Sequence, residues 1–150
     1  FAVALIDGYA LIGAYGNDYD ENDANFIDDA GAAYIFERQA NASWTQIRKL
    51  VAYDRSEDAN FGKYLDLDKE GLVIGAFRAD QSNGSLFEVG TAYASYWNDT
   101  MLITGPSEVQ SNDLLRFSST DQNSLEKFGW DVAISGRWAV VGKANKAHQP

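Results

Sequence analysis

The stretch that decides the fold occurs three times, as FAVALIDGYALIG at residues 1–13, KYLDLDKEGLVIG at 63–75 and WDVAISGRWAVVG at 130–142. The copies align without gaps, and the glycines that end them lie 62 and 67 residues apart. Self-similarity at such a period is typical of repeat architectures. Each repeat is a unit that cannot bury its hydrophobic face alone and therefore has to stack on its neighbours.

Each copy predicts a β-hairpin. In its first half, apolar residues alternate with others at the period of two that is typical of a strand. The alternating pairs are Val3 and Leu5, Leu65 and Leu67, and Val132 and Ile134. A tight turn follows, such as Asp7-Gly8 in the first copy. The second half is almost continuously apolar, which favours a strand that is buried on both faces.

The similarity continues past the hairpin. Residues 31–36 match 90–95 and predict a third strand, and residues 44–51 match 111–118 and predict a fourth. Four short strands per repeat make the blade of a β-propeller. We therefore expect an all-β fold made of four-stranded antiparallel blades. A β-solenoid with another strand count is the alternative.

The repeat spacing divides the chain into blades at residues 1–60 and 61–127 and a partial blade at 128–150. A propeller usually closes with about four to eight blades. Residues 1–150 are thus expected to be a partial propeller of about two and a third blades. Membership of a larger propeller is favoured over a ring that several copies close together.

The residues Phe61-Gly62, two strands, Gly75-Ala76-Phe77 and then Gly90-x-Ala-Tyr93 resemble the FG-GAP repeat. This repeat builds the head propellers of integrin α-subunits, and the version here is closest to that of bacterial and algal surface proteins. The resemblance implies a propeller fold and an extracellular or cell-surface location. The integrin-type calcium loop is not intact between the first two strands, so calcium has to be argued from other residues.

The densest run of charge lies between the second and third predicted strands. Asp18, Asp20 and Asn22 have the spacing of positions one, three and five of a calcium-binding loop, and Asp29 occupies position twelve. Asp23 stands where the sharp turn of such a loop requires glycine. Between residues 18 and 29 there is no Lys or Arg, so an extended, self-repelling loop is expected unless a cation binds. A solvated acidic loop without calcium is the alternative.

Three sequons, at Asn41, Asn83 and Asn98, fall in predicted loops and indicate N-linked glycosylation if the source is eukaryotic. Tyr96 and Trp97 stand beside a long insertion and predict a surface that stacks on a glycan, with packing between blades as the alternative.

Two further aspartates, Asp54 and Asp121, each lie seven residues before a Phe-Gly pair. The pattern predicts turn residues that cap backbone amides.

Composition excludes several functions. The net charge is −10, so the chain is not expected to have the basic surface that binding of nucleic acid requires. Its apolar runs are short, which argues against membrane insertion. The chain has no cysteine and one histidine, His148, so the usual catalytic and zinc-binding sets are missing and we expect no enzyme activity. The leading hypothesis is a non-catalytic adhesion or assembly module with protein partners. A lectin and an accessory propeller of a larger secreted enzyme are the alternatives.

Overall fold

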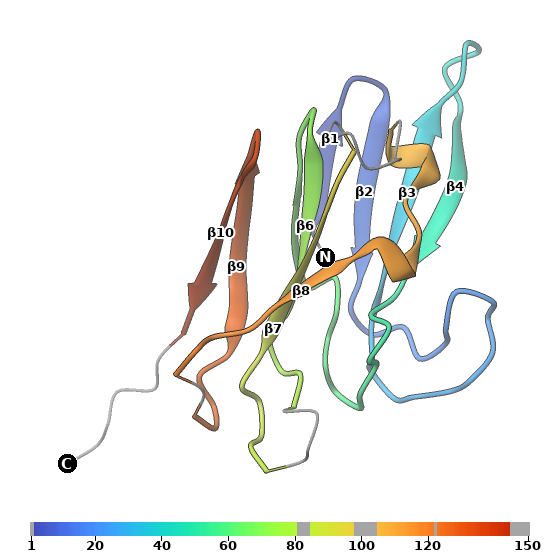
Figure 1. The fold of residues 1–150 in the computed structure, drawn as a ribbon. Helices are drawn as coiled ribbons and strands as arrows, with labels where there is room; N and C mark the ends of the chain where they lie inside the picture. Colours follow the sequence, from blue (N-terminus) through green and yellow to red (C-terminus); the bar gives the residue numbers. More distant parts are fainter. Residues whose placement is uncertain (1, 81–84, 98–104, 122, 145–150) are drawn as a thin grey trace.

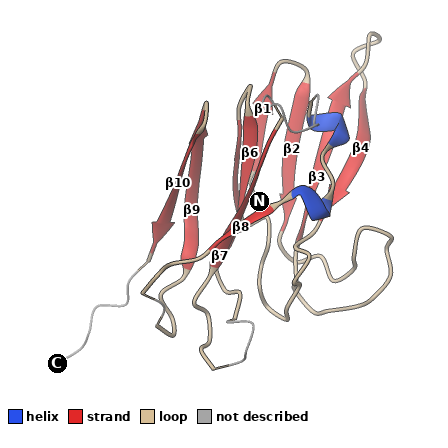
Figure 2. Ribbon diagram, in the orientation of Figure 1, coloured by secondary structure: helices blue, strands red, loops and turns tan. Residues whose placement is uncertain are grey.

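The computed structural model describes residues 2–80, 85–97, 105–121 and 123–144, and within them it contains three antiparallel sheets (Figures 1 and 2). The first sheet, blade 1, has the order β1-β2-β3-β4 and the second, blade 2, has the order β5-β6-β7-β8. The third sheet is the hairpin β9-β10. The strands are β1 (Val3–Ile6), β2 (Tyr9–Ala14), β3 (Ala32–Arg38), β4 (Trp44–Leu50), β5 (Tyr64–Leu67), β6 (Gly71–Ala76), β7 (Thr91–Tyr96), β8 (Leu115–Phe117), β9 (Phe128–Ser135) and β10 (Trp138–Lys143).

This architecture confirms the all-β prediction and the four-stranded blades. All three predicted hairpins form, and in the first the register pairs Val3 with Ile12 and Ile6 with Tyr9. Each sheet runs up and down in sequence order, as propeller blades do. The assignment of the whole chain to one partial propeller stays a prediction.

The predicted fourth strand of blade 2 is wrong in its first half. Only Leu115–Phe117 is a strand, whereas Pro106–Glu108 (η1) and Ser111–Asp113 (η2) are single 3₁₀ turns. The Asp113 carboxylate accepts the Gln110 N–H at 2.9 Å and closes the second turn. The Ser111 hydroxyl accepts the Val51 N–H from blade 1 at 3.1 Å, so this segment connects blades. Among the described residues, neither helix has the length and hydropathy needed to span a membrane.

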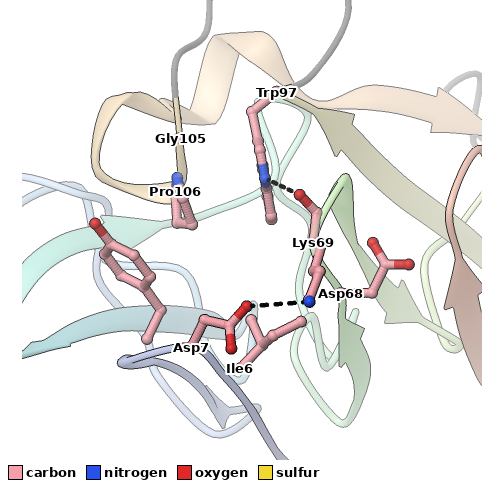
Figure 3. Close-up of a pocket in the computed structure, with 8 residues that line it drawn as sticks. Ile6, Asp7, Asp68, Lys69, Trp97, Gly105 and Pro106 are labelled. Carbon is pink, nitrogen blue, oxygen red and sulfur yellow. Dashed lines mark hydrogen bonds and ion pairs between the residues drawn. The ribbon is translucent and has the colours of Figure 1, made fainter.

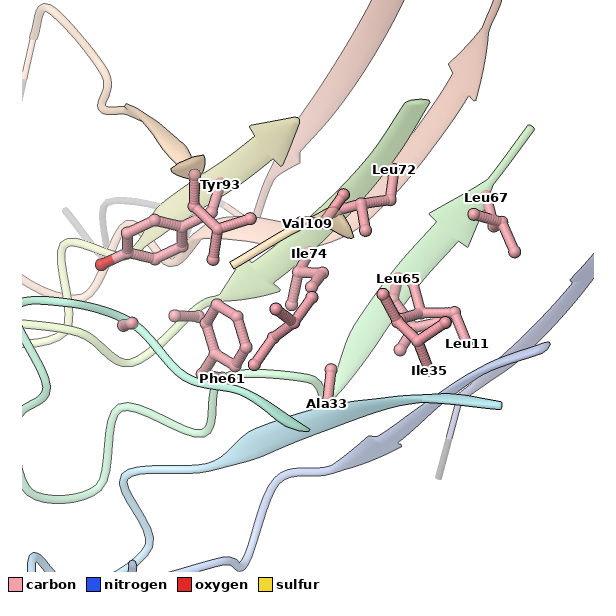
Figure 4. Packing of buried hydrophobic residues seen from close by; sticks show 14 of the residues in the cluster. Leu11, Ala33, Ile35, Phe61, Leu65, Leu67, Leu72, Ile74, Tyr93 and Val109 are labelled. Carbon is pink, nitrogen blue, oxygen red and sulfur yellow. The ribbon is translucent and has the colours of Figure 1, made fainter. Parts of the chain in front are cut away.

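The core lies between the sheets. Leu11, Ala33 and Ile35 of blade 1 pack into one cluster with Leu65 and Ile74 of blade 2 (Figure 4). A second, smaller cluster joins blade 2 to the β9-β10 hairpin and is built on Val73, Ala92, Ala94, Val132 and Ile134. Both clusters therefore bury the apolar face that one sheet cannot cover alone.

The Phe-Gly pairs occupy equivalent places at the two junctions, as predicted. Phe61 forms an isolated parallel bridge with Gly31, and Phe128 forms the same bridge with Gly90. Phe61 is fully buried, whereas Phe128 is only half-buried. The prediction of a buried Phe128 is thus met only in part, because the described part of the third sheet has two strands instead of four to cover the ring.

Candidate functional site

The loop 15–31, the connection 51–63 between blades 1 and 2, and the described residues 77–80 and 85–90 lie at one end of the blades (Figure 1). We call this set the loop rim. Its longest described member is the β2–β3 loop, which carries the acidic run. Backbone hydrogen bonds connect neighbouring rim loops. The Asp58 N–H, for example, donates to the Asp28 carbonyl at 3.0 Å.

Three carboxylates of the β2–β3 loop converge. One oxygen each from Asp18, Asp28 and Asp29 lies within 4.8 Å of the others. The Asp18 carboxylate also accepts the Asp29 N–H at 2.9 Å, which draws the two ends of the loop together. Asp28 is exposed and the other two are half-buried. Carboxylate oxygens at this separation can share one hard metal ion.

Of the four predicted metal ligands, the structure brings together only Asp18 and Asp29. The Asp20 carboxylate instead accepts the N–H groups of Asn22 and Ala24, at 2.9 and 3.0 Å, and the side-chain amide of Asn25. These hydrogen bonds hold the pKa of Asp20 below its usual value, and the bond from the Ala24 N–H has the largest effect. The calcium-loop spacing was therefore the wrong template for Asp20 and Asn22, which shape a turn and do not join the cluster.

Asp28 is the ligand candidate that sequence reasoning missed. The carbonyls of Asp28 and Asp29 accept N–H groups of Asp58 and Asn60, both at 3.0 Å, and this pairing with the next rim loop fixes the two aspartates side by side. The internal repeat contains a pattern that could have identified Asp28 as a candidate ligand. The stretch before Phe128 matches the stretch before Phe61, so the same pairing recurs between Phe87 and Leu125 in blade 2.

The equivalent place in blade 2 shows how the same loop is built without converging aspartates. There the Asp80 carboxylate accepts the Glu88 N–H at 2.9 Å, as Asp18 does with Asp29. Glu88 binds Arg78 at 2.8 Å and Lys127 at 3.2 Å. Burial alone would raise the pKa of Glu88, but the two cations outweigh it and lower that pKa.

In blade 1 the positions of those two cations hold uncharged residues. Alignment of the anchor glycines places Gly16 at the position of Arg78 and Asn60 at that of Lys127. Asp28 adds a third carboxylate where blade 2 has Phe87. The blade 1 cluster thus has more negative charge than its counterpart and has lost the two cations that neutralise the counterpart.

Cations from outside the acidic run do reach other parts of the loop. Lys49 pairs with Asp23 at 2.7 Å, and Arg55 donates to the carbonyls of Asp18 and Asn25 at 2.7 and 2.8 Å. These contacts hold the loop in a folded arrangement, and its behaviour without a cation stays a prediction. Among the ion pairs of the described residues, none involves the three clustered aspartates.

The predicted glycan-stacking pair is not an exposed surface. Trp97 is 5% exposed, and its indole N–H donates to the Lys69 carbonyl at 2.8 Å (Figure 3). Tyr96 is half-buried and packs against the second core cluster. Trp97 does line a pocket between blades 1 and 2, together with Tyr9 and the Asp7–Lys69 ion pair. Packing between blades, the alternative interpretation, explains both aromatic residues.

The sequons are placed only in part. Asn41 lies in the exposed β3–β4 turn, where its side-chain oxygen accepts the N–H of Ser43 at 3.0 Å and its hydroxyl at 2.7 Å. Asn83 and Asn98 lie outside the described residues. Glycosylation at the three sites stays a prediction.

Asp54 does not cap backbone amides as predicted. Its carboxylate accepts the hydroxyl of Tyr93, which is 1% exposed, and pairs with Arg116 at 3.0 Å. The residue therefore joins the connection after blade 1 to two strands of blade 2. The equivalent Asp121 binds the Ser119 hydroxyl and pairs with Lys143 at 3.1 Å. In both places the side chain forms a link between blades.

The Tyr93 hydroxyl should make stability depend on pH in the alkaline range. Burial, and then the bond to Asp54, raise the pKa of Tyr93 far above its usual value near 10. Unfolded chains therefore lose this proton above about pH 10, whereas the folded protein keeps it, and the free energy of unfolding falls by about 1.4 kcal/mol per pH unit. Urea unfolding at pH 9 to 11.5 should show a shallower fall for Tyr93→Phe than for the wild type. Equal slopes would contradict this origin.

The stacked four-stranded sheets with a Phe-Gly pair at each junction define a class of protein, the propeller-type β-repeat proteins. Within that class the chain belongs to the FG-GAP repeat family, whose model matches residues 44–94 and 112–149. No curated protein matches the chain. The matched segments contain both Phe-Gly junctions but not the acidic β2–β3 loop, so the support for a metal at the aspartate cluster comes from the geometry of that cluster.

Proposed function

We propose that this protein is a non-catalytic adhesion or assembly module, extracellular or at the cell surface, that contacts protein partners through its loop rim. The observation that carries the proposal is the placement of exposed aromatic rings. Four large aromatic side chains are 44 to 62% exposed on the rim loops, namely Tyr19, Phe26, Tyr53 and Phe87. Membership of the FG-GAP family supports the cell-surface setting.

These rings have the chemistry of a protein interface. Aromatic residues are enriched where proteins meet, because they bury a large apolar area with few rotatable bonds. Tyr19 and Phe26 form an edge-to-face pair with centroids 5.7 Å apart. The rim around them is acidic, so the favoured partner is a protein surface with apolar pockets and basic residues.

A calcium ion at Asp18, Asp28 and Asp29 would order this surface. The support is the convergence of the three carboxylates and the loss of the cations that neutralise the equivalent place in blade 2. Calcium prefers carboxylate and carbonyl oxygens and tolerates irregular geometry. The ion would fix the loop that carries Tyr19 and Phe26, and so link metal binding to partner binding.

Calcium should therefore raise the melting temperature through these aspartates. A ligand that binds only the folded state at 100 times its dissociation constant stabilises it by about 2.7 kcal/mol. We expect Asp28→Asn to abolish most of the shift between calcium and chelator, measured by thermal unfolding. Glu21→Gln is the matched control, because Glu21 is an exposed acid of the same loop outside the cluster. A shift that survives Asp28→Asn would exclude this site.

The partner proposal is tested with arrays of extracellular proteins and of glycans. We expect protein hits that are lost in the double variant Phe26→Ala, Phe87→Ala while the melting temperature is kept. Glycan hits without protein hits would instead favour the lectin hypothesis, for which the pocket lined by Asp7, Lys69 and Trp97 is the candidate site. An attached catalytic domain, the third hypothesis, would be found in the full-length protein.

A further inference from the structure

A pocket of about 290 Å³ opens between blades 1 and 2 (Figure 3). It lies at the end of the blades opposite the loop rim, because it is lined by the β1–β2 turn, the β5–β6 turn and the residue that follows β7. The start of η1 completes the lining. The volume is near the lower end of the range for small-molecule sites, so the pocket suits a small ligand.

The internal repeat explains why the two turns stay apart at this junction. At the second junction, the Asp68 carboxylate accepts the N–H of Gly136 and so draws the β5–β6 and β9–β10 turns together. Alignment of the anchor glycines places Ile6 at the position of Asp68 and Lys69 at that of Gly136. Ile6 has no side-chain acceptor, so the equivalent bond is missing at the first junction. An ion pair between Asp7 and Lys69, 3.7 Å apart, links the turns there.

The apolar walls of the pocket are held in place by hydrogen bonds. The Trp97 indole N–H donates to the Lys69 carbonyl at 2.8 Å, and the Tyr9 hydroxyl donates to the Glu37 carboxylate at 3.1 Å. Pro106, which is buried, adds a third rigid surface. Side chains that are already fixed lose little conformational entropy when a ligand binds, so these walls are preorganised for an apolar group.

Two charges of opposite sign at the pocket can be given up to a ligand. The carboxylate of Asp68 is already used, because it accepts three backbone N–H groups. The side chains of Asp7 and Lys69 are 72 and 75% exposed, and their ion pair is long. An exposed ion pair of this kind contributes little to stability. A ligand that pairs with both groups therefore costs the protein little.

We infer that this pocket binds a free α-amino acid with an apolar side chain. The ligand ammonium pairs with Asp7, its carboxylate pairs with Lys69, and its side chain lies between Tyr9 and Trp97. Two charge-assisted hydrogen bonds then replace one long ion pair, and such bonds are about twice as strong as the neutral ones that a second uncharged partner would make. A sugar offers hydroxyl groups only and cannot neutralise either charge. The inference does not depend on the proposed function of the loop rim.

The test is a titration of the 150-residue polypeptide with L-phenylalanine and L-leucine, followed by NMR of nitrogen-labelled protein. Both probes should bind saturably and shift the Lys69 amide and the Trp97 indole N–H. The analogues 2-phenylethylamine and 3-phenylpropanoate each lack one of the two charges, and each should bind about tenfold more weakly than L-phenylalanine. The inference is overturned if neither amino acid binds, or if either analogue binds as tightly as L-phenylalanine.

Variants locate the binding to the two charged groups. Asp7→Asn and Lys69→Met change exposed side chains, so both should keep the melting temperature while they weaken the binding of L-phenylalanine by about tenfold. Glu57→Gln is the control, because it removes an exposed charge on the loop rim and should bind like the wild type. Unchanged affinity in Asp7→Asn or in Lys69→Met overturns the inference. Binding of D-glucose at this pocket without binding of either amino acid overturns it as well and supports the lectin hypothesis.

Discussion

Replacing Phe61 with alanine is expected to lower the free energy of unfolding by about 3–5 kcal/mol, the range for deleting a large aromatic side chain from a packed core. The ring is fully buried between blades 1 and 2. It contacts Tyr93 edge to face, with centroids 5.4 Å apart. Its backbone is held by the N–H bond to the Ala30 carbonyl at 3.1 Å, so the surroundings cannot easily collapse into the cavity.

Urea unfolding followed by tryptophan fluorescence measures this loss. Phe87→Ala is the matched control, because Phe87 is 62% exposed and its truncation should change stability by no more than about 0.5 kcal/mol. Phe128→Ala should fall between the two, since the half-buried ring has less contact to lose. A Phe61→Ala variant as stable as Phe87→Ala would mean that the Phe-Gly pair is not a junction residue.

The repeat made much of the fold predictable from sequence. In-register recurrence of hairpins and Phe-Gly pairs identified the blades, because a stacked repeat has to place equivalent residues in equivalent surroundings. The predictions that were wrong concern side chains that bind residues of a neighbouring blade. Asp54 resembles a turn aspartate locally, and only the stacking of blade 2 brings Tyr93 and Arg116 to it.

The candidate metal site was predictable only in part, for a related reason. A twelve-residue loop template assumes that all ligands come from one freely curling segment. Here residues 28–30 are tied to residues 58–61 by backbone bonds, which fixes Asp28 and Asp29 and leaves Asp20 to shape a turn. Trp97 was mispredicted for the same reason. It lies next to an insertion in the sequence, and only the packing of the blades shows that its indole N–H donates to the Lys69 carbonyl.

Main chains of adjacent blades approach each other closely at two glycines. Around Gly13 of β2, a β-carbon would lie 1.8 Å from the carbonyl oxygen of Gly62 and 2.9 Å from its carbon. The second junction repeats this arrangement, with a β-carbon on Gly75 placed 2.2 Å from the oxygen of Gly129. Glycine is therefore required at these positions by the space between two main chains, and no flexible side chain is available to move aside.

Gly13→Ala is accordingly expected to lower the free energy of unfolding by about 3 kcal/mol or more, the upper end of overpacking penalties. The steric clash can be relieved only if the whole of blade 2 shifts. Gly142→Ala is the internal control. Gly142 occupies the same place in β10, but its nearest neighbour is the Asp131 oxygen at 3.3 Å, so alanine should cost less than about 1 kcal/mol. Urea unfolding of the two variants, with slopes compared to the wild type, measures the difference. Equal losses at both positions would show that the substitution acts through strand propensity and that blades 1 and 2 are not locked by their glycine backbones.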